Sequence, residues 1–501
     1  MKKLHLFLFI VLYVSVSFSQ TGSIIWAKNF GGSGNDTWPS VLQDNDSNIV
    51  SVTWSNSNNG YVNTNYGNYD ILCIKTNRNG DTIFSKNFGS YADDSPKKII
   101  NATDGGYLIA ANTNDSNKVK GGYDIWLIKI DTNGDTLWTK TYGGSNDDFV
   151  YNINKTNDNN YILSIGSKSN DGDFNTNNGG YDAWFVKINT SGNIIWKKHY
   201  GGSLNDISHS LTNTSDGYIF NVKSKSSDGD FNINYGESDI TLIKFDIQDS
   251  IQWTKHIGGS NYDNIIKIIE LENNYYLFGN TYSNDSDITN NHGAWDFLVI
   301  KLNNAGNILW QKCYGGSLND VSRSAILVNN TFFIAGGSKS SDGDVANNKG
   351  ENDIWILNID TAGTILWQKN YGGTYDEEAT KIIETLDGNL LFSAYTESYN
   401  DDISGNLGSS DLWLVKLSTS TTTNITDLKP TGVSIYPNPT SGIFNISSSD
   451  KIDNIQIFNS LGAKIIETKN TQINISNYNK GVYVIKIKTK NTLITKKLIL
   501  N

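Results

Sequence analysis

The stretch DAWFVKINTSGNIIWKKHYGGS, residues 182–203, decides the fold. Its pattern is that of two short apolar strands, 182–189 and 194–200, with a tight turn between them. The turn opens on Asn189 and closes on Gly192. An Asx residue at the first position and a glycine at the fourth are typical of a hairpin built on a type I turn, in which the glycine takes positive φ. The stretch therefore predicts a β-hairpin.

The second half of this hairpin recurs along the chain. Its pattern is an aromatic residue, any residue, a lysine, any residue, a second aromatic and then usually Gly-Gly-Ser. The first aromatics of the seven copies are Trp26, Phe84, Trp138, Trp196, Trp253, Trp310 and Trp367. An aspartate that opens the preceding strand recurs as well, at Asp70, Asp124, Asp182, Asp239, Asp296, Asp353 and Asp411. Two markers with one period establish seven internal repeats.

Each repeat contains four expected strands. In the third copy they are 149–155, 161–167, 182–189 and 194–200. Four-stranded units repeated seven times predict an all-β fold, a seven-bladed β-propeller. A solenoid is the competing interpretation, but its coils are usually much shorter. The repeats begin with a lone fourth strand at 24–30 and end with a third strand at 411–418. We therefore expect the N-terminal strand to complete the last blade, which hides two sheet edges.

Four segments follow from these patterns. Lys2 and Lys3, an apolar run and Ser17-Phe18-Ser19 predict a secretory signal peptide over 1–19. The propeller is expected over 20–418, a Ser/Thr-rich linker over 419–432 and a small β-sandwich over 433–501. No later apolar run reaches the ~20 residues of a membrane-spanning helix, so the mature protein is expected to have no transmembrane segment.

Charge differs between these segments. Residues 434–501 hold nine lysines against Asp450, Asp453 and Glu467, which gives +6. The whole chain carries −11, so about −19 is left for the propeller once the two signal lysines are set aside. An acidic body argues against a nucleic-acid partner, because phosphates require Lys and Arg. Cys73 and Cys313 are the only cysteines, too few for a disulfide framework, and whether they pair is left open.

Strand direction places the loops. The long loop between strands two and three and the crossover to the next blade emerge on one face, where we expect a glycan or protein ligand. These long loops hold candidate calcium ligands in Asp-x-Asp pairs, because Ca²⁺ prefers hard oxygen ligands. The pairs are Asp171 and Asp173, Asp228 and Asp230, Asp285 and Asp287, and Asp342 and Asp344. The first blade has Asn56-Ser57-Asn58 instead. Asx turns explain the same residues without a metal.

Other polar and aromatic residues of this face have two interpretations each. The crossovers end in an acid once per blade, which indicates a loop fastener that the strand lysines could pair with. These acids are Asp36, Asp94, Asp148, Asp206, Asp263, Asp320 and Glu377. Trp38 and Trp54 stand outside the repeat register, and exposed aromatics could stack on sugar rings.

No catalytic constellation is recognisable, since no Ser, Cys or carboxylate stands in a clear relation to the histidines. The sequence favours a non-enzymatic binding or adhesion module. Two alternatives remain. One is a carbohydrate-active enzyme with carboxylates in the propeller mouth, and the other is a structural surface component.

The C-terminal segment carries a second set of motifs. It opens with Tyr436-Pro437-Asn438-Pro439 and Gly442, continues with Gly481 and Tyr483, and ends with Lys496 and Lys497. These motifs resemble the type A C-terminal sorting domain of the type IX secretion system. The resemblance covers 433–501. It implies export through the periplasm, recognition by the outer-membrane translocon, and release or anchoring at the cell surface.

Overall fold

The computed structural model describes residues 22–248, 250–419, 433–448, 451–459, 463–489 and 493–501. The predicted signal peptide and nearly all of the predicted linker lie outside these residues. Two compact units are present, one within Gln20–Ser420 and the other within Thr421–Asn501.

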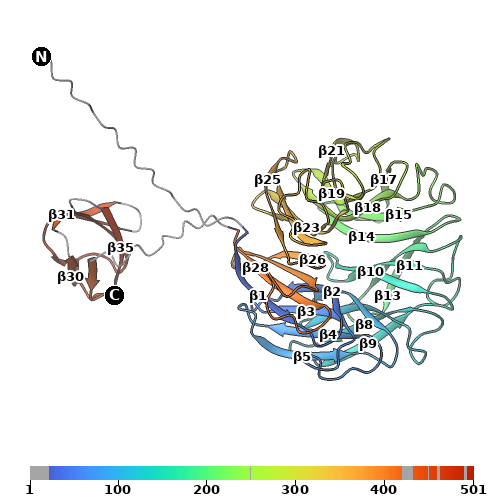
Figure 1. Cartoon of the computed structure of the whole chain (residues 1–501), viewed down its shortest axis with the longest axis horizontal. Helices are drawn as coiled ribbons and strands as arrows, with labels where there is room; N and C mark the ends of the chain where they lie inside the picture. The colour runs from blue at the N-terminus through green and yellow to red at the C-terminus, as the bar shows by residue number, and fades with distance from the viewer. Residues whose placement is uncertain (1–21, 249, 420–432, 449–450, 460–462, 490–492) are drawn as a thin grey trace, which may run out of the picture. The chain divides into compact units, whose positions relative to one another are not determined.

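The first unit consists of seven four-stranded antiparallel sheets (Figure 1). Blade 1 contains β2 (Asp36–Gln43), β3 (Ile49–Ser55), β4 (Asp70–Thr76) and β5 (Thr82–Phe88). Blade 2 contains β6 (Asp94–Asn101), β7 (Tyr107–Thr113), β8 (Asp124–Ile130) and β9 (Thr136–Tyr142). Blade 3 contains β10 (Asp148–Lys155), β11 (Tyr161–Ser167), β12 (Asp182–Ile188) and β13 (Ile194–Tyr200). Blade 4 contains β14 (Asp206–Thr214), β15 (Gly217–Ser224), β16 (Asp239–Asp246) and β17 (Ile251–Ile257).

The remaining blades repeat this order. Blade 5 contains β18 (Asp263–Leu271), β19 (Asn274–Thr281), β20 (Asp296–Asn303) and β21 (Ile308–Tyr314). Blade 6 contains β22 (Asp320–Val328), β23 (Thr331–Ser338), β24 (Asp353–Ile359) and β25 (Ile365–Tyr371). Blade 7 contains β26 (Glu377–Glu384), β27 (Leu390–Thr396), β28 (Asp411–Leu417) and the N-terminal strand β1 (Ile24–Phe30).

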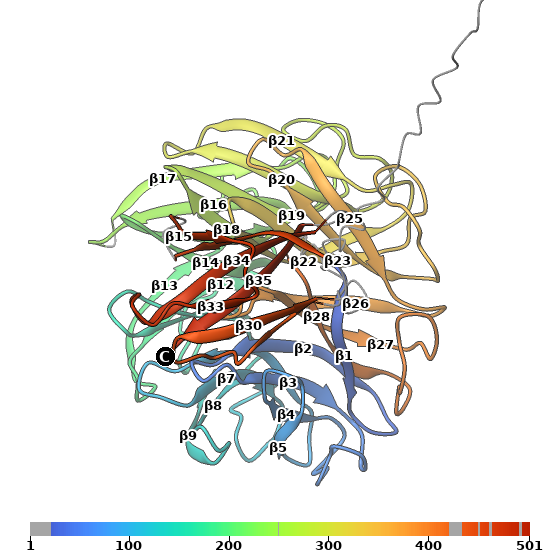
Figure 2. The same ribbon diagram turned by 90° about the vertical axis from the view of Figure 1, so that its left-hand side faces the viewer.

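The ring closes as the sequence predicts. Strand β1 pairs antiparallel with β28, and the Gly22 N–H donates to the Ser418 carbonyl oxygen at 2.8 Å. In both views the two strands lie side by side although they come from opposite ends of the unit (Figure 1, Figure 2). The first strand of each blade contacts the first strand of the next, from β2 through β26 and back to β2. The seven-bladed propeller with terminal closure is therefore confirmed.

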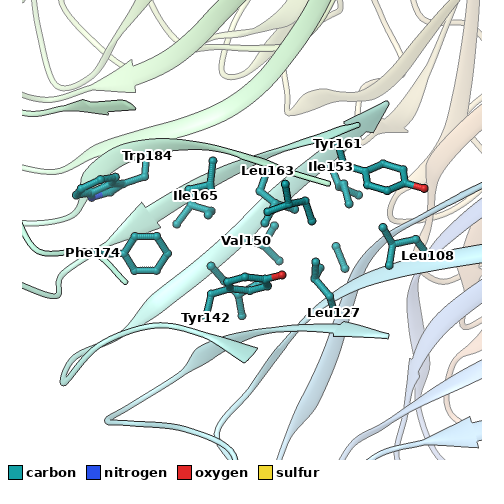
Figure 3. Close-up of a cluster of buried hydrophobic side chains, with 14 of the residues drawn as sticks. Leu108, Leu127, Tyr142, Val150, Ile153, Tyr161, Leu163, Ile165, Phe174 and Trp184 are labelled. Atoms are coloured by element: carbon teal, nitrogen blue, oxygen red, sulfur yellow. The ribbon is translucent and has the colours of Figure 1, made fainter. Parts of the chain in front are cut away.

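The apolar core lies within and between the blades. Figure 3 shows one such cluster, where Leu108 and Leu127 of blade 2 pack against Val150, Leu163 and Ile165 of blade 3. The middle strands are buried along their whole length, whereas the outer strands are mostly half-buried. Burial on both faces explains why these strands are continuous apolar runs rather than alternating patterns.

Every inner strand carries a β-bulge near its start. In blades 2 to 7 the register shifts three residues after the acid that opens the strand, for example between Val150 and Asn152. In blade 1 the shift begins one residue earlier, between Thr37 and Ser40. A bulge turns two consecutive side chains toward one side of the sheet. Both residues line the cavity of the central channel in every blade except blade 4, where only Ser210 does.

The second unit contains two sheets around one apolar cluster. One sheet has the order β29 (Val433–Tyr436), β30 (Ile443–Ser448), β33 (Gln472–Asn474). The other has the order β32 (Lys464–Thr468), β31 (Ile452–Phe458), β34 (Gly481–Thr489), β35 (Leu493–Leu500). Phe444 and Ile446 from the first sheet share a core with Ile455, Ile485 and Leu498 from the second. This is the β-sandwich that the sequence predicts.

Candidate functional site

The Asp-Gly-Asp motifs lie where the long loop of a blade folds back on the crossover leading into that blade. In blade 3, Asp171 Oδ1 accepts a hydrogen bond from the Ser145 N–H at 2.7 Å, and Asp173 Oδ2 accepts one from Gly143 at 3.0 Å. Gly172 between them has φ +61°, and a Cβ there would lie 2.4 Å from the Gly143 carbonyl oxygen. Conformation and close approach both require the glycine.

The exact copies in blades 4 and 6 make the same contacts. Asp228 and Asp230 accept the amides of Ser203 and Gly201, and Asp342 and Asp344 accept those of Ser317 and Gly315. In the variant copy Asp285 accepts the amide of Ser260, and Ser286 keeps φ +56°. Asp287 Oδ2 is buried and has no hydrogen-bond partner among the described residues. The motif fastens loop to loop in each of these four blades.

The structure corrects the position assigned in blade 1. The residues that take the motif's place are not Asn56-Ser57-Asn58 but Asn59 and Gly60. Asn59 Oδ1 accepts the Ser33 N–H at 2.8 Å, and Gly60 has φ +68°. In blade 7, Asn400 Oδ1 accepts the Thr374 N–H at 3.1 Å. Both asparagines stand 11 residues before the strand-opening aspartate, as Asp171 does, and this spacing was the signal to follow.

The two asparagines bear on the calcium interpretation. A neutral amide oxygen performs the same task in blades 1 and 7 that a carboxylate oxygen performs in blades 3 to 6, which is to accept a backbone N–H. Among the described residues, no group of three or more His, Cys, Asp or Glu side chains is arranged to hold a metal ion. The loop contacts are explained without a cation, so calcium binding stays a prediction from the sequence.

We expect the melting temperature of the purified chain to be the same in EDTA and in millimolar Ca²⁺, because the Asp171-type oxygens already accept N–H donors. Asp171→Asn keeps the acceptor and is expected to leave the melt unchanged, whereas Asp171→Ala lowers it by about 1–2 °C. Differential scanning calorimetry measures both. A fall of several degrees in EDTA that Asp171→Asn reproduces would establish calcium loops instead.

The acids that open the inner strands are fully buried. Asp320 shows the pattern: its carboxylate accepts the Ser338 hydroxyl, the Ser340 hydroxyl at 2.8 Å and the Gly316 N–H at 2.7 Å. Burial raises the pKa of Asp320 although these donors favour the charged form. Equivalent bonds are made by Asp36, Asp94, Asp148, Asp206, Asp263 and Glu377. These acids hold crossover and long loop together.

The acids that open the third strands are buried beside them. Each accepts the backbone N–H four residues earlier through Oδ2, as Asp353 does from Lys349 at 2.5 Å. The Oδ1 atoms of all seven are buried without a hydrogen-bond partner in the described part of the chain. In six of these carboxyls, burial raises the pKa most, and the charge of the neighbouring inner-strand acid raises it further. The pKa is raised to about 6 for Asp70, Asp296 and Asp353 and to about 7 for Asp124, Asp239 and Asp411.

Two of the outer-strand lysines pair with other acids, contrary to the sequence interpretation. Lys28 Nζ lies 2.8 Å from Asp81 Oδ1, and Lys86 contacts Asp135. Both partners lie in the tight turn of the next blade, because the outer strand of one blade runs beside the last hairpin of its neighbour. These lysines therefore link blades at the turn face.

Two histidine contacts were not apparent from the sequence. His199 Nε2 lies 2.7 Å from Asp182 Oδ2, and His292 Nδ1 lies 2.7 Å from Asp296 Oδ2. Both aspartates belong to the repeated strand-opening set. His199 reaches its aspartate from an outer strand, and His292 reaches its aspartate from a long loop.

A cavity of about 280 Å³ occupies the central channel and is lined by inner-strand residues of all seven blades. At its rim, Trp38 is 45% exposed and adopts φ +54°. The Tyr395 ring lies 5.7 Å from the Trp38 ring, and the Arg323 guanidinium lies 5.1 Å from the Trp38 ring centroid. Arg323 also contacts Glu378. A bulky residue at positive φ is a strained conformation of the kind that clusters at ligand-binding sites.

Trp54, the other out-of-register tryptophan, lies elsewhere. Its ring packs 4.3 Å from Tyr69, and it is half-buried. Cys73 and Cys313 are free and buried, and burial raises the pKa of both thiols to about 12. Low thiolate content makes them poor nucleophiles.

In the second unit, the opening and closing sorting motifs meet. Asn438 Oδ1 accepts the Ile499 N–H at 2.9 Å, and the Thr440 N–H donates to the Ile499 carbonyl oxygen at 2.8 Å. Gly442 has φ +144°, and a Cβ there would lie 2.6 Å from Ser476 Cβ. The start and the end of this domain are thus held by direct bonds.

The remaining motif residues have separate positions. Tyr436 is exposed, Tyr483 is buried in β34, and Lys496 is exposed on β35. Pro437 and Pro439 flank Asn438, and Gly481 begins β34. The Lys497 side chain is outside the described set.

Residues 434–501 match the family described as secretion system C-terminal sorting domain. This confirms the resemblance to type IX sorting domains, so the chain is cargo of that secretion system with a propeller body. Export to the cell surface or beyond follows from the domain. Within the part of the chain that the structure describes, no helix has the length and hydropathy needed to cross a bilayer.

No curated protein matches the chain. Among solved structures, one similar chain is a protein of unknown function from Dyadobacter fermentans, at 11% identity and TM-score 0.39, covering 79% of this chain and 99% of that one. Another is the phage phi92 endosialidase, at 10% identity and TM-score 0.41, covering 95% and 87%. A third is the α-L-arabinofuranosidase of Fusarium graminearum, at 8% and 0.39, covering 78% and 97%. The fold assignment rests on the strand order of the chain itself.

Proposed function

We propose that this exported propeller is a non-enzymatic binding module that takes a glycan at the mouth of its central channel. The observation that carries the proposal is the Trp38 platform, defined as Trp38 with Arg323 and Tyr395. An aromatic face with a polar group beside it suits a sugar ring, which has an apolar face and hydroxyl groups at its edge.

The position of the platform supports this proposal. Trp38 follows the inner-strand acid of blade 1 by two residues, where the other blades have Pro96, Val150, Ser208, Ile265, Ser322 and Ala379. A single large aromatic therefore breaks the repeat at the channel mouth. Arg323 and Glu378 are held there by their mutual contact, and Glu378 Oε2 accepts the Tyr395 hydroxyl at 3.1 Å. A preorganised arrangement lowers the entropic cost of binding.

The bonding of the acids supports a non-enzymatic role. The inner-strand carboxylates accept hydroxyl and amide donors in every blade, and the Asp-Gly-Asp carboxylates accept amides. Hydrolysis by a carboxylate pair requires two acids that flank the scissile bond of the substrate. The repeated acids are engaged in holding loops, which is a structural task.

We expect the full chain to bind at least one of three soluble saccharides, laminarin, xylan or chitohexaose. The bound saccharide should not be shortened. Trp38→Ala should weaken that binding at least about tenfold, because a central aromatic anchor contributes at least 1–2 kcal/mol. Isothermal titration calorimetry measures the affinity. Trp38→Phe keeps a ring and should retain most of it.

Tyr375→Ala is the matched control, because Tyr375 is a similarly exposed aromatic (51%) in a crossover loop. Product analysis by chromatography runs in parallel. Shortened oligosaccharides would favour the enzyme alternative, and equal loss of binding in Trp38→Ala and Tyr375→Ala would refute the platform.

A further inference from the structure

The central channel is cationic in an otherwise acidic unit. Five of the side chains that line its 280 Å³ cavity are basic: Lys97, Lys98, Lys267, Arg323 and Lys381. No Asp or Glu is among the described residues that line this cavity. Since the propeller as a whole carries about −19, the concentration of lysines here is opposite to the charge of the unit.

Three of these lysines form a ring, which we call the lysine ring: Lys98, Lys267 and Lys381. Each stands four residues after the acid that opens its inner strand, immediately after the β-bulge. The other four blades have Ser40, Asn152, Ser210 and Ser324 at this position. The lysines come from blades 2, 5 and 7, which are separated by three, two and two steps around the ring. They are therefore almost evenly spaced about the channel.

The ring lies at the junction of two cavities. Lys267 and Lys381 line the 280 Å³ cavity and also a second cavity of about 920 Å³ that extends toward the tight-turn face. A small solute could therefore reach the lysines from either end of the channel. The lining of the second cavity also includes two acids, Asp44 and Glu384.

The ammonium groups have few partners. Lys98 Nζ donates to Asn152 Oδ1 at 2.6 Å and to Asn154 Oδ1 at 2.9 Å, which are neutral acceptors. Within the described residues, Lys267 and Lys381 have no side-chain hydrogen bond or ion pair. Arg323 differs, because its charge is offset by Glu378.

Burial and mutual repulsion act on the ring. Loss of solvation, and next the charges of Lys381 and Lys267, hold the pKa of Lys98 well below its usual range. Loss of solvation, with Lys267 beside it, lowers the pKa of Lys381 to about 8. Loss of solvation and mutual repulsion thus disfavour the charged forms of these lysines in the free protein, and an anion between them would offset both costs by stabilising the ammonium forms.

We propose that the lysine ring binds an oxyanion group with two negative charges, of the phosphate or sulfate type. A tetrahedral oxyanion offers enough acceptor oxygens for three ammonium groups, and lysine serves as a point-charge ligand for such groups. This site goes beyond the glycan platform and does not depend on it. The group could be a free ion or a substituent of a saccharide.

The test is calorimetric titration of the full chain at pH 7 and constant ionic strength, with inorganic phosphate, inorganic sulfate, glucose 6-phosphate and glucose as probes. We expect saturable binding of phosphate or sulfate with one site per chain, and none of glucose. Lys267→Met and Lys381→Met should each weaken it at least about tenfold, because each removes one close charge pair. Tighter binding of glucose 6-phosphate than of phosphate would identify a saccharide substituent, and equal binding a free ion.

Lys140→Gln is the control for charge alone, since Lys140 lies on outer strand β9 and contacts Asn193. It should leave phosphate binding unchanged. Without anion, the melting temperatures of the two methionine variants should equal or exceed that of the parent, which would show that they fold. Trp38→Ala should leave phosphate binding intact, so failure of the glycan proposal can be distinguished from failure of the anion site. No saturable binding below about 10 mM, or equal binding by parent and both methionine variants, would overturn the proposal.

Discussion

The propeller is expected to lose stability as the pH rises from 5 to 8. The cause is the set of third-strand acids, whose pKa burial raises to about 6 in Asp70, Asp296 and Asp353. It raises the pKa of Asp124, Asp239 and Asp411 to about 7. In the unfolded chain these groups lose their protons near pH 4. The folded protein therefore holds more protons between pH 4 and 7, and its free energy of unfolding falls across that window.

The expected size is several kcal/mol. A pKa shift of one unit in one group corresponds to about 1.4 kcal/mol. If three of the six groups each contribute a shift of one unit, the free energy of unfolding falls by about 4 kcal/mol. The pKa of His209, lowered by burial to about 4, has the opposite effect between pH 4 and 6.5. The pKa of Lys381, lowered to about 8, affects stability above that pH. Urea unfolding at pH 5, 6, 7 and 8 measures the free energy directly.

Asp411→Asn isolates one blade junction. Asp411 Oδ2 accepts the Leu407 N–H, its Oδ1 is unpartnered in the described structure, and Asp36 is the nearby acid that raises its pKa. An amide removes the charge and can donate toward Asp36. We expect about 1–2 kcal/mol of stabilisation at pH 8 and little change at pH 5. Asp131→Asn, an exposed turn acid, is the control. If the free energy of unfolding of the parent does not change between pH 5 and 8, the raised pKa of the third-strand acids is contradicted.

The blades were predictable because their markers are local. The turn 189–192 follows from Asn189 and Gly192, and the structure shows the Gly192 N–H donating to the Asn189 carbonyl oxygen at 2.9 Å with Gly192 at φ +74°. The expected strand 161–167 matches β11 to the residue. Terminal closure could be inferred from which strand was missing at each end. A period, a turn rule and an unpaired edge require no knowledge of distant contacts.

The site was less predictable because its residues are far apart in the sequence and meet only in the folded ring. Lys98, Lys267 and Lys381 are 169 and 114 residues apart, and only the ring geometry brings them to one level. The bulge that turns them inward has no sequence signature of its own. Trp38 was visible as an exception to the repeat, but its left-handed backbone and its contact with Arg323 were not. Departures from the repeat, aligned by blade position, were the signal that could have found both.

Removal of β1 is expected to have the largest structural effect. Phe30 is 1% exposed and packs with Val41, Leu72 and Leu412, so it joins blade 7 to blade 1. Its burial contributes about 2–3 kcal/mol, and the β1–β28 ladder adds a full strand of backbone bonds. A chain lacking residues 22–30 would expose the β28 edge, which invites association with other chains. We expect aggregation or rapid proteolysis of this variant.

A permuted chain provides the matched control. The same residues can be moved to follow Ser418, joined to it by copies of Thr361 and Ala362, because Ser418, Gly22 and Ser23 already make the backbone bonds of the other positions in the blade 6 turn between β24 and β25. The join is short, because the Ser418 N–H already donates to the Ser23 carbonyl oxygen at 3.0 Å. Blade 7 then forms from continuous chain. This variant should stay monomeric by size-exclusion chromatography with light scattering and should melt within a few degrees of the parent.

The comparison separates two roles of β1. If the permuted chain is stable and the deleted chain aggregates, the strand acts by pairing with β28, wherever it is attached. If both fail, the N-terminal attachment itself is needed, for example to order the first crossover before the ring closes. If the deleted chain stays monomeric and melts like the parent, closure contributes little, and the seven-fold contacts among inner strands alone hold the ring.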